Sequence, residues 1–241
     1  MKIALIGYGK MGKEIEKLLP SRGHQVVLKT NRENPLRAEQ LKNVDVAIEF
    51  STPKTVLNNI DLLIENNIPT VVGTTGWNEA YESIKQKVNA HNGALVHASN
   101  FSIGVNLFFQ LNEQLAKLMS TYEEYTPSIT EIHHTEKLDA PSGTAITLAN
   151  GLLSNYPKRN DWHCSQSDKN KAKEDSLSIE AIREKDVKGT HLVEYKSAID
   201  TLSIQHEAHN RQGFALGAII AAEWIYNKKG IYTMKDVLQL L

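Results

Sequence analysis

A glycine-rich turn near the start of the chain restricts the fold more than any other feature. Gly7, Gly9 and Gly12 form a G-x-G-x-x-G pattern between the apolar run Ile3–Ile6 and an amphipathic stretch. In that setting the first glycine permits a tight turn, the second admits a pyrophosphate, and the third allows close packing of a helix on a strand. The free N–H groups at the helix start then bind the anion. The alternative is a glycine-rich turn without a ligand. The predicted dinucleotide contacts are Gly7, Tyr8, Gly9, Lys10, Met11 and Gly12.

Short apolar runs alternate with amphipathic stretches through the first 100 residues. The apolar runs, rich in Val and Ile, are Ile3–Ile6, Val26–Leu28, Val44–Phe50, Thr70–Val72 and Ala94–His97. The stretches with apolar residues at three- and four-residue spacing are Met11–Leu19, Val56–Asn66 and Glu79–Ala90. This alternation is typical of buried parallel strands joined by crossover helices. We therefore expect an α/β fold that begins with a Rossmann-type, doubly wound parallel sheet.

The pattern changes after about residue 101. The expected elements are a helix at Val105–Met119, a strand at Ser128–His134, a helix at Thr144–Leu153, and strands at Leu177–Ile182, His191–Ser197 and Thr201–His206. Successive strands predict a second, α+β domain with a mixed or antiparallel sheet. The polar segment Lys158–Asp175 is expected to be an exposed loop. Two last helices, Phe214–Tyr226 and Met234–Leu241, are expected to pack on the first domain. The predicted domains are residues 1–101 with 211–241, which bind the dinucleotide, and residues 102–210, which bind the substrate.

Composition limits the class of ligand. The 27 Lys and Arg residues balance 28 Asp and Glu residues, for a formal net charge of -1. Such a balance lacks the cationic surface expected of a nucleic-acid-binding protein. The apolar run at the N-terminus is too short for a signal peptide or a membrane span, and Cys164 has no second cysteine with which to form a disulfide. We expect a cytoplasmic protein without a nucleic-acid or membrane partner.

The end of the second expected strand bears on the choice of nucleotide. It reads Leu28-Lys29-Thr30-Asn31-Arg32 and lacks the acid that usually holds the adenosine ribose. Cations and hydroxyls there favour the 2′-phosphate of NADPH, without excluding NADH. Solvated loop charges are the alternative explanation of Lys29 and Arg32. Two further turns follow the fourth and fifth strands at the same sheet edge. The additional predicted contacts are Lys29, Thr30, Gly73, Thr74, Thr75, Ala98, Ser99, Asn100 and Phe101.

Reactive side chains are densest in residues 131–145. If residues 130–134 form a strand, His133 and His134 point to opposite faces, so at least one faces a cleft. Lys137 follows within reach. Two imidazoles and an ammonium group suit a small anionic hydride acceptor that must finally receive a proton. The alternative is that the histidines satisfy backbone groups and the lysine is a surface charge.

A helix start follows this group. Residues 141–144 read Pro-Ser-Gly-Thr, and the N–H groups of Gly143 and Thr144 at this helix start are expected to bind a carboxylate. A metal site is not expected, because neither an H-E-x-x-H spacing nor a pair of cysteines accompanies the adjacent histidines.

Residues 131–145 resemble the E-x-H-H-x-x-K-x-D-A-P-S-G-T-A signature of the dihydrodipicolinate reductase family. Residues 73–76 and 100–106 resemble the G-T-T-G and N-F-S-x-G-V-N blocks of that family, and the similarity extends from Met1 to Leu241. The resemblance implies a Rossmann-type domain joined to an α+β domain that forms a homotetramer. It also implies reduction of the cyclic dicarboxylate 4-hydroxy-tetrahydrodipicolinate by NADPH or NADH, in the diaminopimelate branch of lysine biosynthesis.

The same resemblance implies roles for individual residues. His133 matches the catalytic acid/base and Lys137 the proton donor, while His134, Gly143 and Thr144 match positions that hold substrate carboxylates. The chain departs from the family at residues 183–185, Arg-Glu-Lys, where an R-G-G loop is usual. Two alternatives stay open: another Rossmann-type dehydrogenase of a small imino or carbonyl acid, and a nucleotide-sensing binding module, which would have no need of the histidine–lysine group.

Overall fold

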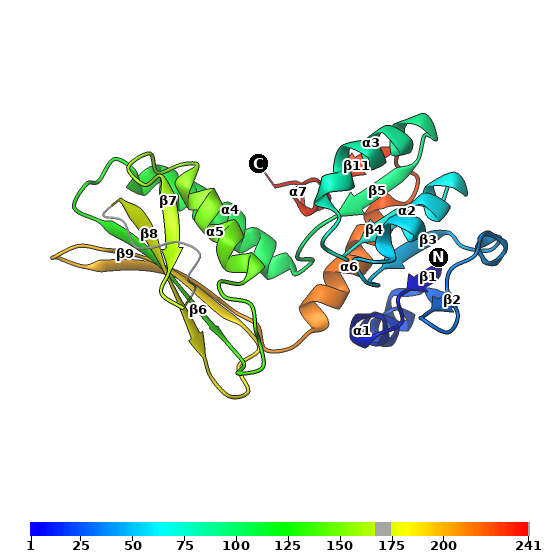
Figure 1. The fold of residues 1–241 in the computed structure, drawn as a ribbon, viewed down its shortest axis with the longest axis horizontal. Helices are drawn as coiled ribbons and strands as arrows, with labels where there is room; N and C mark the ends of the chain where they lie inside the picture. Colours follow the sequence, from blue (N-terminus) through cyan, green and yellow to red (C-terminus); the bar gives the residue numbers. More distant parts are fainter. Residues whose placement is uncertain (167–174, 241) are drawn as a thin grey trace. The chain divides into compact units, whose positions relative to one another are not determined.

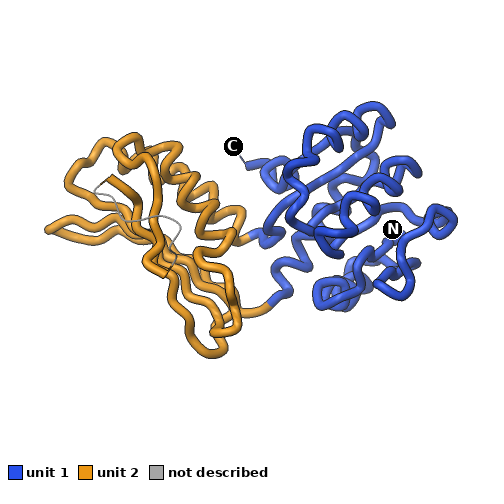
Figure 2. The backbone as a smooth tube through the Cα atoms, in the orientation of Figure 1, with its two compact units in different colours: residues 1–103, 211–241 blue, residues 104–210 orange. Residues whose placement is uncertain are grey.

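The computed structural model describes residues 1–166 and 175–240. The chain divides into two compact units (Figure 2). Unit 1 comprises Met1–Ile103 and Arg211–Leu241, and unit 2 comprises Gly104–Asn210. Within the described residues, none of the helices has the length and apolar character that crossing a membrane requires.

Unit 1 is built on a six-stranded parallel sheet (Figure 1). Its strands are β1 (Lys2–Ile6), β2 (Gln25–Thr30), β3 (Val46–Glu49), β4 (Thr70–Val72), β5 (Ala94–His97) and β11 (Gly230–Tyr232). Their order is β11-β5-β4-β3-β1-β2, and every pairing between neighbours is parallel. The prediction of a Rossmann-type sheet is confirmed.

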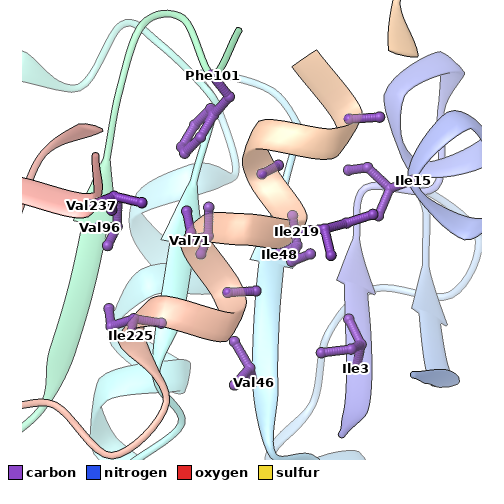
Figure 3. Packing of buried hydrophobic residues seen from close by; sticks show 14 of the residues in the cluster. Ile3, Ile15, Val46, Ile48, Val71, Val96, Phe101, Ile219, Ile225 and Val237 are labelled. Atoms are coloured by element: carbon purple, nitrogen blue, oxygen red, sulfur yellow. The ribbon is translucent and has the colours of Figure 1, made fainter. Parts of the chain in front are cut away.

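Helices cover both faces of this sheet. They are α1 (Lys10–Leu18), α2 (Val56–Glu65), α3 (Tyr81–Ala90), α6 (Gln212–Ile225) and the short α7 (Met234–Val237), with 3-10 turns at Pro20–Arg22, Ala38–Leu41 and Asn78–Ala80. Side chains alternate across each strand, so Ile3 and Leu5 of β1 join the core under α1 and α6 (Figure 3), whereas Ala4 and Ile6 pack on the other side. Helix α6 belongs to unit 1.

Unit 2 is a mixed five-stranded sheet with two helices on one face. Its elements are α4 (Ile103–Met119), β6 (Thr126–His133), α5 (Gly143–Leu153), β7 (Asp161–Cys164), β8 (Ser176–Arg183), β9 (Thr190–Lys196) and β10 (Thr201–Glu207). The strand order is β10-β9-β6-β8-β7, with β6 antiparallel to β9 and parallel to β8. The core lies between the sheet and the apolar sides of α4 and α5. The prediction of a second sheet of mixed type is confirmed.

Two features differ from the sequence prediction. Residues 158–175 were expected to be an exposed loop, but Asp161–Cys164 form β7, which pairs with β8 and buries Cys164 in the core of unit 2. A polar sequence forms a strand there because its partner strand supplies the hydrogen bonds. Residues 167–174 of that segment lie outside the described residues. In unit 1, the three-residue β11 was not predicted, and α7 ends at Val237, earlier than expected.

Candidate active site

The glycine turn of unit 1 has the geometry expected of an anion-binding loop. Gly7 adopts a left-handed φ of 88°, and a Cβ at this position would lie 2.2 Å from the carbonyl oxygen of Phe50. Only glycine fits there. A Cβ on Gly9 would meet nothing within 4 Å, so the backbone is open to a ligand at this point. Helix α1 follows directly, and no side chain caps its N-terminus.

Thr30 and Lys29, at the end of β2, occupy different surroundings. The Thr30 hydroxyl accepts a hydrogen bond from the Gly7 N–H at 3.2 Å, and the Thr30 carbonyl accepts one from the Tyr8 N–H at 2.7 Å. Thr30 therefore fixes the glycine turn. The Lys29 ammonium lies 2.5 Å from the Glu16 carboxylate and 4.6 Å from the centre of the Tyr8 ring. Lys29 is thus paired within the protein, whereas Arg32 and Lys54 line the neighbouring cavity.

A cavity of about 520 Å³ opens beside the turn. Its lining comes from the glycine turn, from the segment after β2 and from the segment after β3, including Arg32, Phe50, Ser51, Thr55 and Asn59. A glycine turn, an uncapped helix and a cavity at the carboxyl edge of a parallel sheet together fit a dinucleotide. The residues after β3 were not among the predicted contacts, although the end of the third apolar run at the same sheet edge was a usable signal.

The turns after β4 and β5 reach the same edge of the sheet. Gly73 is required for packing, since a Cβ there would lie 2.1 Å from the ring of Phe50. The Thr74 hydroxyl accepts the Ser51 N–H at 2.8 Å, which ties the turn after β4 to the segment after β3. Thr75 is exposed. Phe101 has its side chain in the core of unit 1, 2% exposed, so that only its backbone is available to a ligand.

The remaining predicted contacts are spread over the same turns. Ala98 and Asn100 are half-buried, and Ser99 is exposed. Lys10 and Met11 lie in the first turn of α1, where Lys10 is exposed and Met11 packs against the core. The structure thus brings the predicted nucleotide contacts to one edge of the sheet, except that the Lys29 side chain is engaged by Glu16.

In unit 2, the end of β6 holds a compact group of polar side chains. Glu131 and His133 are two residues apart and share the face covered by α5. The Glu131 Oε2 atom accepts the Ser142 N–H at 3.0 Å, lies 3.6 Å from His133 Nδ1, and lies 3.8 Å from His191 Nε2. His191 Nε2 is also 3.2 Å from the Ser142 hydroxyl. One carboxylate is therefore hydrogen-bonded to the start of α5 and lies close to two imidazoles, although His133 Nδ1 has no hydrogen-bond partner among the described residues.

The surroundings of both imidazoles favour their neutral forms. Burial, assisted by the neighbouring His133, lowers the pKa of His191 to about 3. Burial also lowers the pKa of His133, although the Glu131 carboxylate partly opposes that shift. A buried neutral imidazole can accept or donate a proton at one nitrogen while the other is held by a partner.

The other predicted residues of unit 2 lie close in the chain. His134 follows the last residue of β6 and is half-buried. The Lys137 ammonium donates to both oxygens of the Asp139 carboxylate, at 2.8 and 2.7 Å. Gly143 is exposed as the first residue of α5, and a Cβ there would meet nothing within 4 Å. The space around Gly143 is therefore accessible to a ligand, while the Ser142 hydroxyl caps the helix by accepting the Ala145 N–H. Thr144 follows and is half-buried.

Glu131, His133 and His191 each offer a ligand atom within 4.8 Å of the others, which is close enough for a metal ion. However, the Glu131 carboxylate already accepts hydrogen bonds at both oxygens, from the Ser142 N–H and from the Arg183 guanidinium. A nearby guanidinium also repels a dication. The arrangement is better explained as a hydrogen-bonded network than as a metal centre.

The site residues predicted from the sequence did not include Glu131, Arg183 or His191. Strand register brings them together: in the sheet, Arg183 of β8 pairs with His133 and His191 of β9 pairs with Glu131. The two-residue spacing of Glu131 and His133 was a usable signal for the glutamate. The pairing of β6 with β8 and β9 cannot be seen in the sequence.

Comparison with known proteins decides the family. The family model described as dihydrodipicolinate reductase, N-terminus, matches residues 1–101, and the model of the C-terminus of the same enzyme matches residues 104–238. The chain belongs to the dihydrodipicolinate reductase family. It is thereby an NAD(P)H-dependent oxidoreductase, as predicted. A curated relative from Christiangramia forsetii, 4-hydroxy-tetrahydrodipicolinate reductase, is 47% identical over 99% of this chain and 98% of its own length.

Solved structures agree with the fold of this reductase family. The dipicolinate-bound dihydrodipicolinate reductase of Paenisporosarcina sp. TG-14 superposes with a TM-score of 0.77 at 24% identity, covering 97% of both chains. A scyllo-inositol dehydrogenase of Lactobacillus casei has a TM-score of 0.60 at 13% identity, covering 99% of this chain and 92% of its own. At such low identities these structures bear on the fold alone.

Proposed function

We propose that this reductase converts 4-hydroxy-tetrahydrodipicolinate to tetrahydrodipicolinate in the diaminopimelate branch of lysine biosynthesis. The structural observation that supports the proposal is that Glu131 lies next to both the start of α5 and the His133 imidazole. Its Oε2 atom lies 3.0 Å from the Ser142 backbone nitrogen and 3.6 Å from His133 Nδ1. A proton-transferring imidazole and an anion-binding helix start are thus held on one small patch, which suits a small ring that carries carboxylates. Family membership and the name of the Christiangramia forsetii relative support the same substrate.

In the proposed reaction, the substrate loses its ring hydroxyl as water and gains one hydride and one proton. Bound NADPH or NADH supplies the hydride to the ring carbon that carried the hydroxyl. The proton goes to the adjacent carbon, with Lys137 as donor and His133 as acid/base. His134 and the N–H groups of Gly143 and Thr144 hold the substrate carboxylates. An ammonium group such as that of Lys137 can donate a proton, and burial lowers the pKa of His133, which favours an imidazole that can accept one.

For the nucleotide we propose the cavity of unit 1, with the pyrophosphate at Gly7–Gly12 and the start of α1. The turns at Gly73–Thr75 and Ala98–Phe101 would hold the nicotinamide end. Arg32 lines the cavity, which supports use of the 2′-phosphate of NADPH, whereas Lys29 is paired with Glu16.

We also propose that the enzyme works in the cytoplasm as a homotetramer assembled through unit 2. The resemblance to the family supports this assembly. Light scattering of the purified chain measures the mass directly, and a monomer at assay concentrations would contradict the proposal.

The test measures oxidation of NADPH and of NADH through the loss of absorbance of the reduced nicotinamide. The substrate is generated in the assay mixture by the synthase that precedes this enzyme in the pathway. We expect turnover that depends on the synthase product and falls by about 10² to 10⁴ in Lys137→Ala and His133→Ala. Lys117→Ala, an exposed lysine of α4 in the same unit, is the matched control and should retain activity. A folded chain that binds nucleotide but does not turn over this substrate would refute the proposal and favour another small imino or carbonyl acid.

A further inference from the structure

The Glu131 carboxylate is buried beneath the proposed substrate site. It is 0% exposed, although burial of a charge is costly unless the charge is paired and hydrogen-bonded. Its Oε2 atom accepts the Ser142 N–H and faces both His133 and His191, as described above. The carboxylate thus contacts the start of α5 and lies beside the imidazole proposed as acid/base. The three partners, Ser142, His133 and His191, come from different elements of unit 2.

Arg183 compensates that carboxylate from the neighbouring strand. Its Nη2 atom lies 3.2 Å from Glu131 Oε1. The same guanidinium donates to three backbone carbonyl oxygens, those of Lys137 at 3.2 Å, Asp139 at 2.6 Å and Ile182 at 2.9 Å. Arginine presents its donors in a fixed planar fork, so these bonds restrain the loop that follows β6. That loop carries the Lys137 side chain.

We propose that Glu131 and Arg183 are positioning residues of this reductase, an inference that rests on the roles proposed for His133 and Lys137. Glu131 orients the His133 imidazole through its Nδ1 side and holds the first turn of α5. Arg183 neutralises Glu131 and fixes the backbone from which Lys137 extends. The Glu131–Arg183 ion pair thereby fixes the relative positions of the His133 imidazole, the Lys137 side chain and the start of α5. Neither residue of the pair needs to contact the substrate for this role.

The charges that face His133 come from several elements. They are Glu131 on its own strand, Lys137 and Asp139 in the following loop, Arg183 on β8 and the neutral His191 on β9. Burial lowers the pKa of His133, Glu131 acts to raise that pKa, and Arg183 acts to lower it. Removing the carboxylate or the guanidinium should therefore move the His133 titration in opposite directions. A role confined to packing would not produce such a pair of shifts.

The experiment combines kinetics with histidine NMR of the substrate-free protein. The variants are Glu131→Gln, Arg183→Gln and Arg183→Lys, with Glu180→Gln as matched control, because Glu180 lies exposed on β8 and its loss removes one carboxylate charge. The signal of His133 is assigned by its absence in His133→Asn. We expect the titration midpoint of His133 to fall by about one pH unit in Glu131→Gln and to rise in Arg183→Gln, with the control unchanged.

Turnover separates charge from geometry. Arg183→Lys keeps the positive charge but cannot reach the same set of carbonyls, so we expect a near-native His133 titration with a kcat lowered about 10²-fold. The KM for NADPH should stay unchanged in these variants, because the proposed nucleotide cavity lies in unit 1. Unchanged kcat in Arg183→Lys would overturn the role of Arg183 in positioning Lys137.

Shifts of His133 in the same direction in Glu131→Gln and Arg183→Gln, or shifts no larger than in the control, would overturn the role of the pair at His133. If Glu131→Gln does not fold, the two arginine variants still decide the question. If the native chain does not reduce the proposed substrate, the proposed function fails, whereas the NMR titrations still test the pair.

Discussion

Replacement of Gly217 by alanine tests the tightest contact in unit 1. Gly217 lies buried on α6, where a Cβ would stand 1.7 Å from the carbonyl oxygen of Phe101 and 2.8 Å from its carbonyl carbon. Real Cβ atoms do not approach closer than 3.0 Å, so helix and turn must separate by at least about 1.3 Å. Both sides are backbone, so no side chain can move aside to relieve the contact.

The expected cost is at the upper end of that for overpacked cores. Such substitutions typically cost about 1 to 3 kcal/mol, and here we expect about 3 kcal/mol because α6 and the segment after β5 are both held in the core. A chain of this size loses about 2 to 4 °C in Tm for each kcal/mol, so Tm should fall by about 6 to 12 °C. The KM for NADPH should also rise, since Phe101 ends the turn predicted to contact the nicotinamide.

Thermal unfolding followed by circular dichroism measures the effect. Gly213→Ala on the same helix is the matched control, because a Cβ there lies 3.6 Å from the nearest atom, the Ser102 hydroxyl oxygen, which is an ordinary contact. It should leave Tm unchanged or raise it slightly, by reducing the freedom of the unfolded chain. A Gly217→Ala variant that melts within about 2 °C of the native protein would refute the reasoning from this close approach.

Two further predictions concern the nucleotide cavity. Arg32→Ala should raise the KM for NADPH about tenfold, equivalent to about 1.4 kcal/mol, with little effect on the KM for NADH. Lys29→Ala should raise the KM for NADPH less, because Lys29 is paired with Glu16. Steady-state kinetics with both nucleotides measure these effects, and a larger rise in Lys29→Ala than in Arg32→Ala would contradict the prediction. Burial raises the pKa of Glu49, and hydrogen bonds from Ser51 and Asn59 only partly offset that rise. Its contribution to stability is therefore complete below pH 4.5, the ordinary value, and is lost as pH rises through the elevated pKa. Denaturant unfolding between acidic and alkaline pH should show a flatter profile for Glu49→Gln, and parallel profiles for the two proteins would contradict the assignment.

Much of unit 1 could be predicted because its signals are local. The turn at Gly7 follows from the spacing of three glycines, and each of the strands β1 to β5 contains a short apolar run. The direction of the Lys29 side chain could not be predicted, since its partner Glu16 lies on the preceding helix and only packing decides between an internal ion pair and a ligand. The three-residue β11 escaped notice because it depends on the edge of β5 for its hydrogen bonds.

Unit 2 was less predictable, because its site depends on pairing between distant strands. The adjacent histidines and the helix start at residues 142–144 are visible in the sequence. Arg183 lies 50 residues after His133 in the chain, yet the parallel register of β6 with β8 sets the two side by side. A polar strand such as β7 is also difficult to predict from the sequence, because it is stabilised by pairing with β8 and not by an apolar pattern of its own.

Two glutamates of the chain show how surroundings, and not residue type, decide what a buried carboxyl does. Glu49 and Glu131 are both 0% exposed and both stand near the end of a strand. Glu49 has hydroxyl and amide partners, so the effect of burial exceeds that of its hydrogen bonds and favours the neutral form of the carboxyl. A neutral carboxyl can link neighbouring turns without placing a charge beside the phosphates of the proposed nucleotide. Glu131 instead accepts hydrogen bonds from a guanidinium and a backbone N–H. Glu49→Gln should therefore be tolerated, because the carboxyl that it replaces favours the neutral form, whereas Glu131→Gln should be harmful, because it removes the charged partner of Arg183.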